Sequence, residues 1–363
     1  MDVAAFDFHL PPELIAQEPA AERTGAKLMA LDRRSGAIAH HAVADLPRLL
    51  RPGDVIVVNN TRVFPARLLG RRVPSGGAVE CFLVRRENLD EPSRESAAAG
   101  APPSGGVLWE ALVHPGQKLK PGSRVEFADG RLRGEVVEWH YFGRRVVRLW
   151  TEDGSDVDAV VDAIGHTPLP PYIKRGDLTA DRTRYQTMFA RHRGSIAAPT
   201  AGLHFTPALV DALDARGIER VEITLHVGYG TFQPVRVERV EDHHVETEQY
   251  DIGPDAAAAI ARAKRDGRRV VAVGTTTTRT LEAVARAHGG VVVPGAGATD
   301  LFIYPGFDFQ VIDGLITNFH LPRSSLLMLV AAFAGRERVL MAYDAAIARG
   351  YRFYSYGDAM ITV

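Results

Sequence analysis

The chain has 363 residues, enough for two domains or for one domain with a large insertion. Its net charge is −1, so the chain lacks the excess of basic residues that is common in nucleic-acid-binding proteins. A net charge near zero still allows a local basic patch. The only cysteine, Cys81, excludes an intrachain disulfide and any cysteine cluster around zinc or iron–sulfur. No apolar run is long enough to span a membrane, and the N-terminus lacks a signal-peptide pattern, so we expect a cytoplasmic protein.

Short strands separated by Pro-Gly and Asp-Gly turns fill residues 66–152. The expected strands are Val79–Arg85, Val107–His114, Arg124–Phe127, Leu132–Trp139 and Arg145–Trp150. This pattern predicts a small β-barrel or sandwich, with Cys81 as a packed core residue rather than a nucleophile. Residues 87–106 are rich in Pro, Gly, Ala and Ser, which predicts a disordered loop between two of the strands.

The flanking parts of the chain alternate buried strands with helices. The expected strands are Asp54–Val58, Val221–Val227, Val270–Val273 and Gly314–Thr317. One helix starts at Thr206-Pro207 and stops at Gly217, and another covers Asp255–Asp266 and stops at Gly267. We predict a layered α/β domain with a mostly parallel sheet (residues 1–65 plus 153–363) that carries an inserted small β-barrel domain (residues 66–152).

Four stretches hold more Gly, Thr, His and Arg than folding requires. The loop Ala197–Thr206 consists of small residues and leads into a capped helix, where a ligand can approach the backbone and an anion is favoured. A tight turn in which His204 bonds a local carbonyl is the structural alternative. The stretch Thr224–Phe232 ends a strand in a Gly-x-Gly turn, the usual ligand position in open α/β sheets, but Pro234 excludes a dinucleotide fingerprint.

The third stretch, Val270–Glu282, passes from a strand through Gly274 into a helix whose first turn is all threonine. Its N–H groups and hydroxyls suit a carboxylate or phosphate, and a simple helix cap is the alternative. In the fourth, Ile316–Ser324, Asn318 and His320 alternate, which puts both on one side; a buried, backbone-bonded histidine is equally compatible.

Two further segments carry polar or aromatic side chains in unusual density. Residues Glu241–Glu248 concentrate acids and imidazoles, which suit a metal, a general base or merely a solvated loop. The C-terminal run Tyr351–Asp358 interleaves aromatics with arginine, which favours stacking on bases or a packed final strand.

Taken together, these motifs resemble the S-adenosylmethionine:tRNA ribosyltransferase-isomerase family of queuosine biosynthesis. The matching segments are Phe6–Phe8, Ile15–Pro19, Arg51–Asp54, Asn59–Val63, Pro65–Arg67, Pro168–Ile173, the four stretches above and Tyr351–Asp358. The resemblance implies an α/β domain with an inserted β-barrel. It implies transfer and isomerisation of the ribosyl part of S-adenosylmethionine onto 7-aminomethyl-7-deazaguanine at the wobble position of a tRNA with a GUN-type anticodon, giving epoxyqueuosine-tRNA, adenine and methionine. It also implies a monomer that uses no metal.

The sulfonium of this substrate acidifies the neighbouring C5′ protons, so a positioned base can remove one. The candidate proton-transfer residues are His204, Asp242, His243 and His320. The predicted substrate-binding residues are Asn59, Thr61, Arg62, Tyr185, Gln186, Thr200, Gly202, His226, Gly228, Gly230, Thr275, Thr276, Arg279 and Asn318. Among these, the helix start at Thr275 and Arg279 suits the methionine carboxylate or a tRNA phosphate.

The chain departs from the family pattern at a few positions. Asn60 stands where the family has aspartate, Val245 and Glu246 replace a methionine and a histidine, and Ala26-Lys27 replace Ser-Arg. Three alternatives therefore stay open: a paralogue with another nucleoside acceptor, a metal-dependent phosphoesterase built on Asp242, His243 and His244, and a noncatalytic tRNA-binding module.

Overall fold

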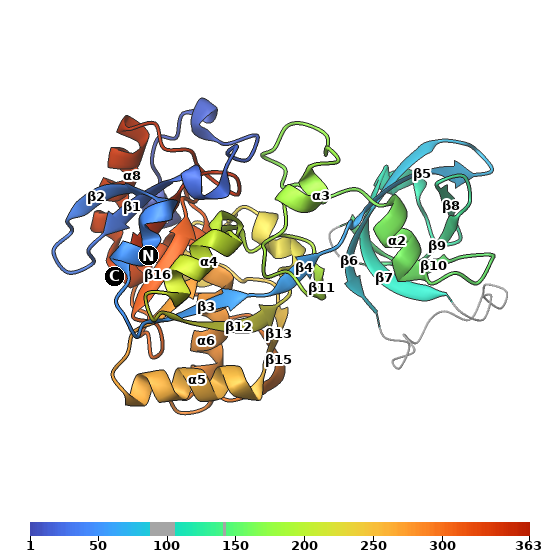
Figure 1. Ribbon diagram of the computed structural model, residues 1–363. Helices are drawn as coiled ribbons and strands as arrows, with labels where there is room; N and C mark the ends of the chain where they lie inside the picture. Colours follow the sequence, from blue (N-terminus) through green and yellow to red (C-terminus); the bar gives the residue numbers. More distant parts are fainter. Residues whose placement is uncertain (88–105, 141–142) are drawn as a thin grey trace. The chain divides into compact units, whose positions relative to one another are not determined.

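The computed structural model describes residues 1–87, 106–140 and 143–363 (Figure 1). They divide into two compact units. The α/β unit contains Met1–Val63, Pro170–Gly176 and Thr183–Val363, and the barrel unit contains Phe64–Leu169 and Asp177–Arg182. The loop expected to be disordered lies outside the described residues, apart from Glu87 and Gly106 at its ends.

A nine-stranded sheet in the order β15-β13-β12-β3-β14-β16-β17-β1-β2 forms the centre of the α/β unit. Its strands are β1 Lys27–Leu31, β2 Ile38–Ala42, β3 Val55–Asn59, β12 Glu219–Leu225, β13 Glu248–Ile252, β14 Val270–Val273, β15 Gly295–Thr299, β16 Gly314–Asn318 and β17 Ala359–Thr362. The neighbours β12, β3, β14 and β16 are parallel, as are β17 and β1. The other four pairs are antiparallel. The predicted α/β layering is therefore confirmed, but the sheet is mixed rather than mostly parallel. Strands β4 Thr61–Val63 and β11 His192–Ser195 form a separate parallel pair.

Helices cover the sheet because its central strands are apolar on both faces (Figure 1). Along β3, Val55 and Val57 belong to one core cluster, whereas Ile56 and Val58 belong to a second, as expected when successive side chains point to opposite faces. The helices of the α/β unit are α1 Leu46–Leu49, α4 Pro207–Asp214, α5 Pro254–Arg265, α6 Thr275–Ala287, α7 Ser325–Ala334 and α8 Arg336–Ala348. Helix α2 Val157–Ile164 belongs to the barrel unit, and α3 Asp181–Arg184 begins in that unit. Within the described ranges, none of these helices has the length and apolarity needed to cross a membrane.

The predicted helix ends follow from local chemistry. The Thr206 hydroxyl accepts a hydrogen bond from the Leu209 N–H at 3.2 Å, and Pro207 occupies the first turn of α4. Gly217 and Gly267, the two predicted stops, have φ of 72° and 66°, which only glycine adopts freely. The expected starts and stops of α4 and α5 are therefore confirmed to within a few residues.

The barrel unit is a closed barrel with strand order β10-β7-β6-β5-β8-β9. Its strands are β5 Arg67–Val73, β6 Ala78–Arg86, β7 Val107–His114, β8 Arg124–Phe127, β9 Leu132–Trp139 and β10 Arg144–Trp150. Five of these confirm the expected strands, whereas β5 had no counterpart because its sequence, RLLGRRV, does not alternate. Cys81 lies in the barrel core with 1% of its surface exposed, and burial raises the pKa of its thiol to about 12, so it is not a reactive nucleophile.

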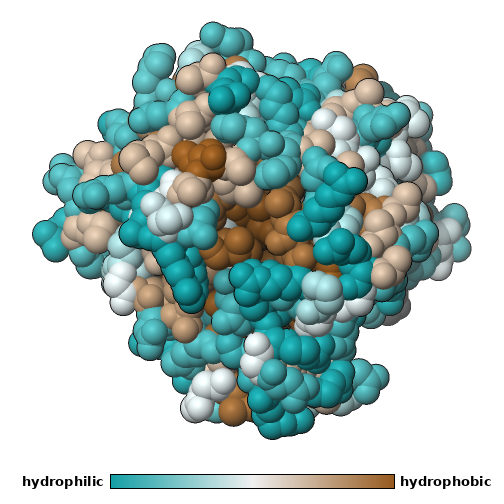
Figure 2. All heavy atoms as spheres, turned by 60° about the vertical axis from the view of Figure 1, so that its left-hand side comes forward, coloured by the Kyte–Doolittle hydropathy of each residue, from teal (hydrophilic) through white to brown (hydrophobic). Residues whose placement is uncertain are grey.

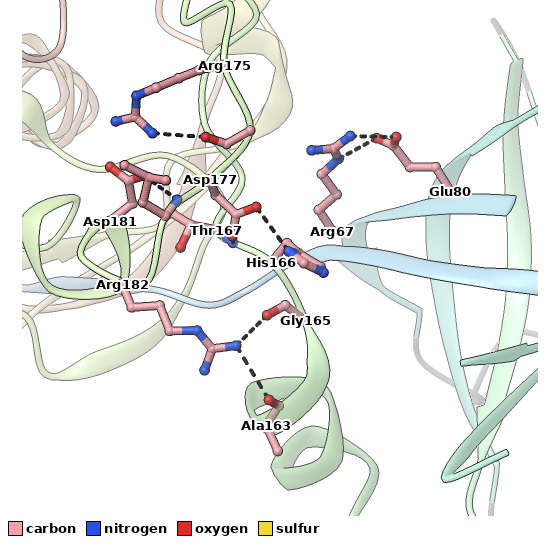
Figure 3. A network of polar contacts seen from close by, with 12 residues as sticks. Arg67, Glu80, Ala163, Gly165, His166, Thr167, Arg175, Asp177, Asp181 and Arg182 are labelled. Carbon is pink, nitrogen blue, oxygen red and sulfur yellow. Dashed lines mark hydrogen bonds and ion pairs between the residues drawn. The ribbon is translucent and has the colours of Figure 1, made fainter. Parts of the chain in front are cut away.

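A polar network attaches residues Asp177–Arg182 to the barrel unit (Figure 3). The Asp177 carboxylate accepts from the Thr167 N–H at 3.0 Å and lies 3.0 Å from His166 Nδ1. The Arg182 guanidinium donates to the carbonyls of Gly165 and Ala163, just beyond and within α2. These bonds explain why this segment groups with the barrel although residues 170–176 group with the α/β unit.

One face of the molecule, shown in Figure 2, carries hydrophobic residues in a hollow that hydrophilic side chains surround. Apolar side chains thus reach the surface at this hollow and are framed by polar groups.

Candidate active site

The main cavity of the α/β unit spans about 590 Å³, part of which is open to solvent. It lies where three strands of the central sheet end, since it is lined by Val227 just after β12, Gly274 just after β14, and Thr317 and Asn318 in β16. The carboxyl ends of parallel strands are the usual ligand position in open α/β sheets. Six predicted site residues line this cavity: Tyr185, Thr200, Thr275, Thr276, Asn318 and His320.

The threonine run at the start of α6 divides into two groups. The hydroxyls of Thr277 and Thr278 donate to the carbonyls four residues earlier, at 2.9 and 3.1 Å, and so belong to the helix. Thr275 and Thr276 line the cavity instead, directly after Gly274, whose φ of 94° requires glycine. The cavity therefore meets a helix N-terminus flanked by two hydroxyls, an arrangement that favours an anionic group.

Asn318 is the last residue of β16, and hydrogen bonds hold the nitrogen end of its side-chain amide. Its Nδ2 donates to the Tyr354 carbonyl at 3.1 Å and to His204 Nε2 at 3.3 Å. Its Oδ1 is buried and has no hydrogen-bond partner within the described part of the chain. Since buried acceptors are rarely left unpaired, this oxygen marks a position suited to a ligand donor.

Two buried histidines near the cavity, His320 and His204, are both neutral at pH 7. Burial lowers the pKa of His320 to about 3, and its Nε2 lies 2.8 Å from the Thr317 hydroxyl. Burial likewise lowers the pKa of His204 to about 4. Because desolvation disfavours the imidazolium, each ring holds the unprotonated form that can accept a proton or a hydrogen bond.

Two tyrosines that were not among the predicted site residues form one wall of the cavity. The rings of Tyr172 and Tyr354 have centroids 4.0 Å apart at 37°, and the Tyr172 hydroxyl bonds the Ser355 hydroxyl. Burial raises the pKa of Tyr172 well above its usual value, so its ring stays neutral. The sequence feature that could have indicated Tyr354 was the aromatic run before the final strand. That strand starts only at Ala359, so Tyr354 lies in a loop.

A second cavity, of about 420 Å³, shares Thr231 and Leu326 with the first. The predicted residues Gly230 and Arg279 line it, and the Arg279 guanidinium pairs with Glu248 at 2.6 Å. Gly228 does not line it, but its N–H donates to the Glu248 carboxylate at 2.9 Å. The structure therefore separates Arg279 from Thr275, which the sequence had joined in one anion site.

Asn59, Thr61 and His226 belong to a buried network beside the main cavity rather than to its lining. Asn59 Nδ2 donates to the Leu225 carbonyl at 2.9 Å, and Asn59 Oδ1 accepts from the Thr61 N–H at 3.0 Å. The Thr61 hydroxyl lies 2.8 Å from His226 Nδ1. Asn60, where the chain departs from the family, uses its Oδ1 to accept from the Thr224 hydroxyl at 2.7 Å and bonds within the fold.

The remaining predicted residues lie outside the linings of both cavities. Gln186 bonds the N–H and carbonyl of Val63, Gly202 packs against Thr187, and Arg62 is exposed on β4. Asp242 is exposed, and His243 packs edge-to-face on Phe302 with ring centroids 5.0 Å apart. In the described ranges, no group of three or more His, Cys, Asp or Glu side chains is arranged to hold a metal ion.

The fold and the cavity define the structural class of the protein: a layered α/β unit with a cavity at the ends of parallel strands, together with a closed β-barrel unit. The chain belongs to the family described as queuosine biosynthesis protein, whose model matches residues 3–362. It is 52% identical over 363 residues to the S-adenosylmethionine:tRNA ribosyltransferase-isomerase of Heliobacterium modesticaldum, covering 100% of both chains. It is 50% identical over 361 residues to the enzyme of the same name from Desulfitobacterium hafniense, covering 99% of both. The crystal structure of S-adenosylmethionine tRNA ribosyltransferase from Thermotoga maritima is also similar, with 35% identity, a TM-score of 0.53, and coverage of 99% of this chain and 100% of that one.

Proposed function

We propose that this chain transfers and isomerises the ribosyl group of S-adenosylmethionine onto 7-aminomethyl-7-deazaguanine in the anticodon wobble position of a tRNA, releasing adenine and methionine. The names of its relatives and the full-length family match support this activity. The single structural observation that carries it is the main cavity, which combines a helix N-terminus, a buried unpaired acceptor, a neutral histidine and an aromatic wall.

The methionine carboxylate suits the start of α6. The helix N-terminus favours a negative charge, and the Thr275 and Thr276 hydroxyls can donate to it. The rings of Tyr172 and Tyr354 offer a surface for a nucleobase, since stacking accepts any base. A wobble nucleotide lies in a single-stranded loop, so it can turn into such a cavity with little loss of pairing.

Among the four candidate proton-transfer residues, we propose that His320 accepts the C5′ proton. It lines the main cavity, and burial keeps its imidazole unprotonated. Removal of a proton next to a sulfonium requires a base in that form. Asp242 and His243, which lie outside the cavity lining, are then left with structural or accessory roles.

The remaining proposals concern the organisation and setting of the enzyme. We propose residues 1–65 plus 153–363 as the catalytic domain and 66–152 as the inserted barrel domain. The division into two compact units supports a barrel inserted near residue 64, but it groups residues 153–169 and 177–182 with the barrel rather than with the catalytic domain. We further propose a cytoplasmic monomer that acts on tRNAs with GUN-type anticodons and needs no metal.

The proposal is tested by measuring adenine release from S-adenosylmethionine with tRNA carrying 7-aminomethyl-7-deazaguanine, in the presence and absence of EDTA. We expect release that requires this tRNA and persists with EDTA. Release with a different tRNA nucleoside would indicate another acceptor. Loss of activity on chelation, restored by a divalent ion, would indicate the phosphoesterase-type alternative, and salt-sensitive tRNA binding without adenine release would indicate a binding module.

A further inference from the structure

His204 and Asn318 form a hydrogen-bonded pair between two cavities of the α/β unit. Asn318 lines the main cavity, and His204 lines a smaller cavity of about 290 Å³ that also contains Arg23 and Arg184. Both side chains are buried, with 1% of Asn318 and 6% of His204 exposed. A buried polar pair of this kind is stable only when each donor faces an acceptor.

The partners of the Asn318 amide decide which of its ends is the donor. The Tyr354 carbonyl oxygen can only accept, so the atom 3.1 Å from it must be Nδ2. The same Nδ2 directs its second hydrogen to His204 Nε2, 3.3 Å away. His204 Nε2 must therefore present a lone pair, which requires a neutral imidazole with its proton on Nδ1.

The surroundings of His204 favour this neutral form. Desolvation is the largest cause of its lowered pKa, which the Arg23 backbone partly opposes. The positive charges of Arg23 and Arg352 lower the pKa further. Near neutral pH, Nε2 thus remains a hydrogen-bond acceptor for Asn318.

We propose that His204 is a positioning residue: it fixes the Asn318 amide so that Oδ1 accepts a hydrogen bond from a hydroxyl or N–H of the bound substrate. This inference rests on the proposed function. S-adenosylmethionine carries such donors on its ribose hydroxyls, its adenine amino group and its α-ammonium, and we assign Oδ1 to the adenosyl part because the methionine carboxylate is placed at the start of α6. Asn318 Oδ1 is buried and unpaired within the described residues, whereas both hydrogens of Nδ2 are directed to acceptors. A ligand donor at Oδ1 would complete the hydrogen bonding of the amide.

The same geometry opposes a proton-accepting role for His204. Its Nε2 lone pair is already used by Asn318, and a proton there would break the bond and set two donors against each other. His320 differs, because it lines the main cavity and its Nε2 faces the Thr317 hydroxyl, which can accept a hydrogen bond as well as donate one.

The test compares His204→Gln with His204→Leu in the adenine-release assay. Glutamine Oε1 can still accept the bond from Asn318, so we expect kcat/KM to stay within about threefold of the parent, whereas leucine lowers it by about 10- to 100-fold, mainly through KM for S-adenosylmethionine. His288→Leu is the matched control, because His288 is exposed and its imidazole bonds the Val284 carbonyl at the end of α6. Equal, large losses in both His204 variants would overturn the positioning role and favour proton transfer.

The substrate donor is identified by binding of S-adenosylhomocysteine and its 2′-deoxy, 3′-deoxy and N6,N6-dimethyl analogues. We expect the parent to disfavour one analogue, and Asn318→Leu to lose that discrimination. Discrimination that is unchanged in Asn318→Leu would overturn the assignment of Oδ1.

A readout independent of activity is the ¹⁵N resonance pattern of the His204 imidazole. We expect the Nδ1–H tautomer near pH 7, and an Nε2–H tautomer or an imidazolium would overturn the pair. An inactive parent that shows the expected tautomer would count against the proposed function but not against the pairing of His204 with Asn318.

Discussion

Arg279 Nη1 donates to Glu248 Oε2 at 2.6 Å, and both side chains are at least nine-tenths buried. The second Glu248 oxygen accepts from the Gly228 N–H, and Arg279 Nε donates to the Leu301 carbonyl at 2.9 Å. This ion pair therefore joins α6, the start of β13 and the turn after β12 along the second cavity.

Replacing Arg279 by methionine should destabilise the protein strongly. The change leaves the Glu248 carboxylate buried without its cation, which typically costs about 3–5 kcal/mol in the free energy of unfolding. The measurement is urea denaturation of the two proteins. Arg262→Met is the control, because Arg262 pairs with Glu219 at 2.7 Å with 49% of its side chain exposed, and such pairs contribute about 1 kcal/mol or less. Similar losses of unfolding free energy in both variants would show that burial does not determine how much the Arg279–Glu248 pair contributes to stability.

Thr275→Val should weaken S-adenosylmethionine binding without loss of stability. Thr275 lines the main cavity, so removal of its hydroxyl should raise KM by about 3- to 10-fold through one lost hydrogen bond to the substrate. Thr278→Val is the control, since that hydroxyl donates to the Gly274 carbonyl within the helix. If only the control raised KM, the helix start would not be the carboxylate position.

Tyr354→Leu should weaken binding of the nucleobase that stacks on the aromatic wall. Stacking contributes about 1–3 kcal/mol per base, so the affected dissociation constant should rise at least about fivefold. Calorimetric titration with S-adenosylhomocysteine and, separately, with the tRNA would show which ligand uses this wall. Tyr304→Leu is a control, because Tyr304 packs on Phe302 and lines neither cavity. Unchanged affinity for both ligands would show that the aromatic wall does not contact either of them.

The low pKa values of His204 and His320 predict a loss of stability in mild acid. In the unfolded chain both titrate near pH 6.5, but in the folded protein they bind protons only near pH 4 and 3. The unfolded state therefore takes up more protons as the pH falls below about 6.5, and the stability present above that pH is lost at up to about 1.4 kcal/mol per pH unit for each histidine. The slope of unfolding free energy between about pH 6.5 and 4 should be smaller in His204→Gln, and an unchanged slope would contradict this.

Gly70→Ala should destabilise the barrel. A Cβ at Gly70 in β5 would come within 2.2 Å of the Glu126 carbonyl oxygen and 2.5 Å of the Phe127 ring, and the backbone of β8 cannot move aside without breaking the closed barrel. We expect a loss of about 1–3 kcal/mol, typical of overpacking. Gly176→Ala, where a Cβ meets no atom within 4 Å, should leave the unfolding free energy nearly unchanged.

Local patterns explain how much of the fold the sequence could predict. Alternation along β6 and β9 and the Thr206–Pro207 helix start are set by neighbouring residues, so they were predictable. Strand β5 was missed because its two leucines are adjacent and flanked by arginines and glycine, and only closure of the barrel makes them a strand.

The site was harder to predict from the sequence than the fold, because tertiary contacts bring its residues together. Tyr172 stacks on Tyr354, far away in the chain, and no local pattern reports that contact. Likewise, the long Arg279 side chain reaches Glu248 rather than the helix start beside it, a choice that depends on the position of β13. Asn318 and His320 both line the cavity, in keeping with their alternation at the end of β16.

The buried thiol of Cys81 has a practical consequence for spectroscopy. Because this lone cysteine is shielded in the barrel and its pKa is raised to about 12, maleimide reagents should leave it unlabelled in the native protein. A fluorophore or spin label could then be attached at a newly introduced surface cysteine without first removing the natural one. The same thiol would become reactive only when the barrel opens, so the rate at which it is labelled would report the rate of barrel opening.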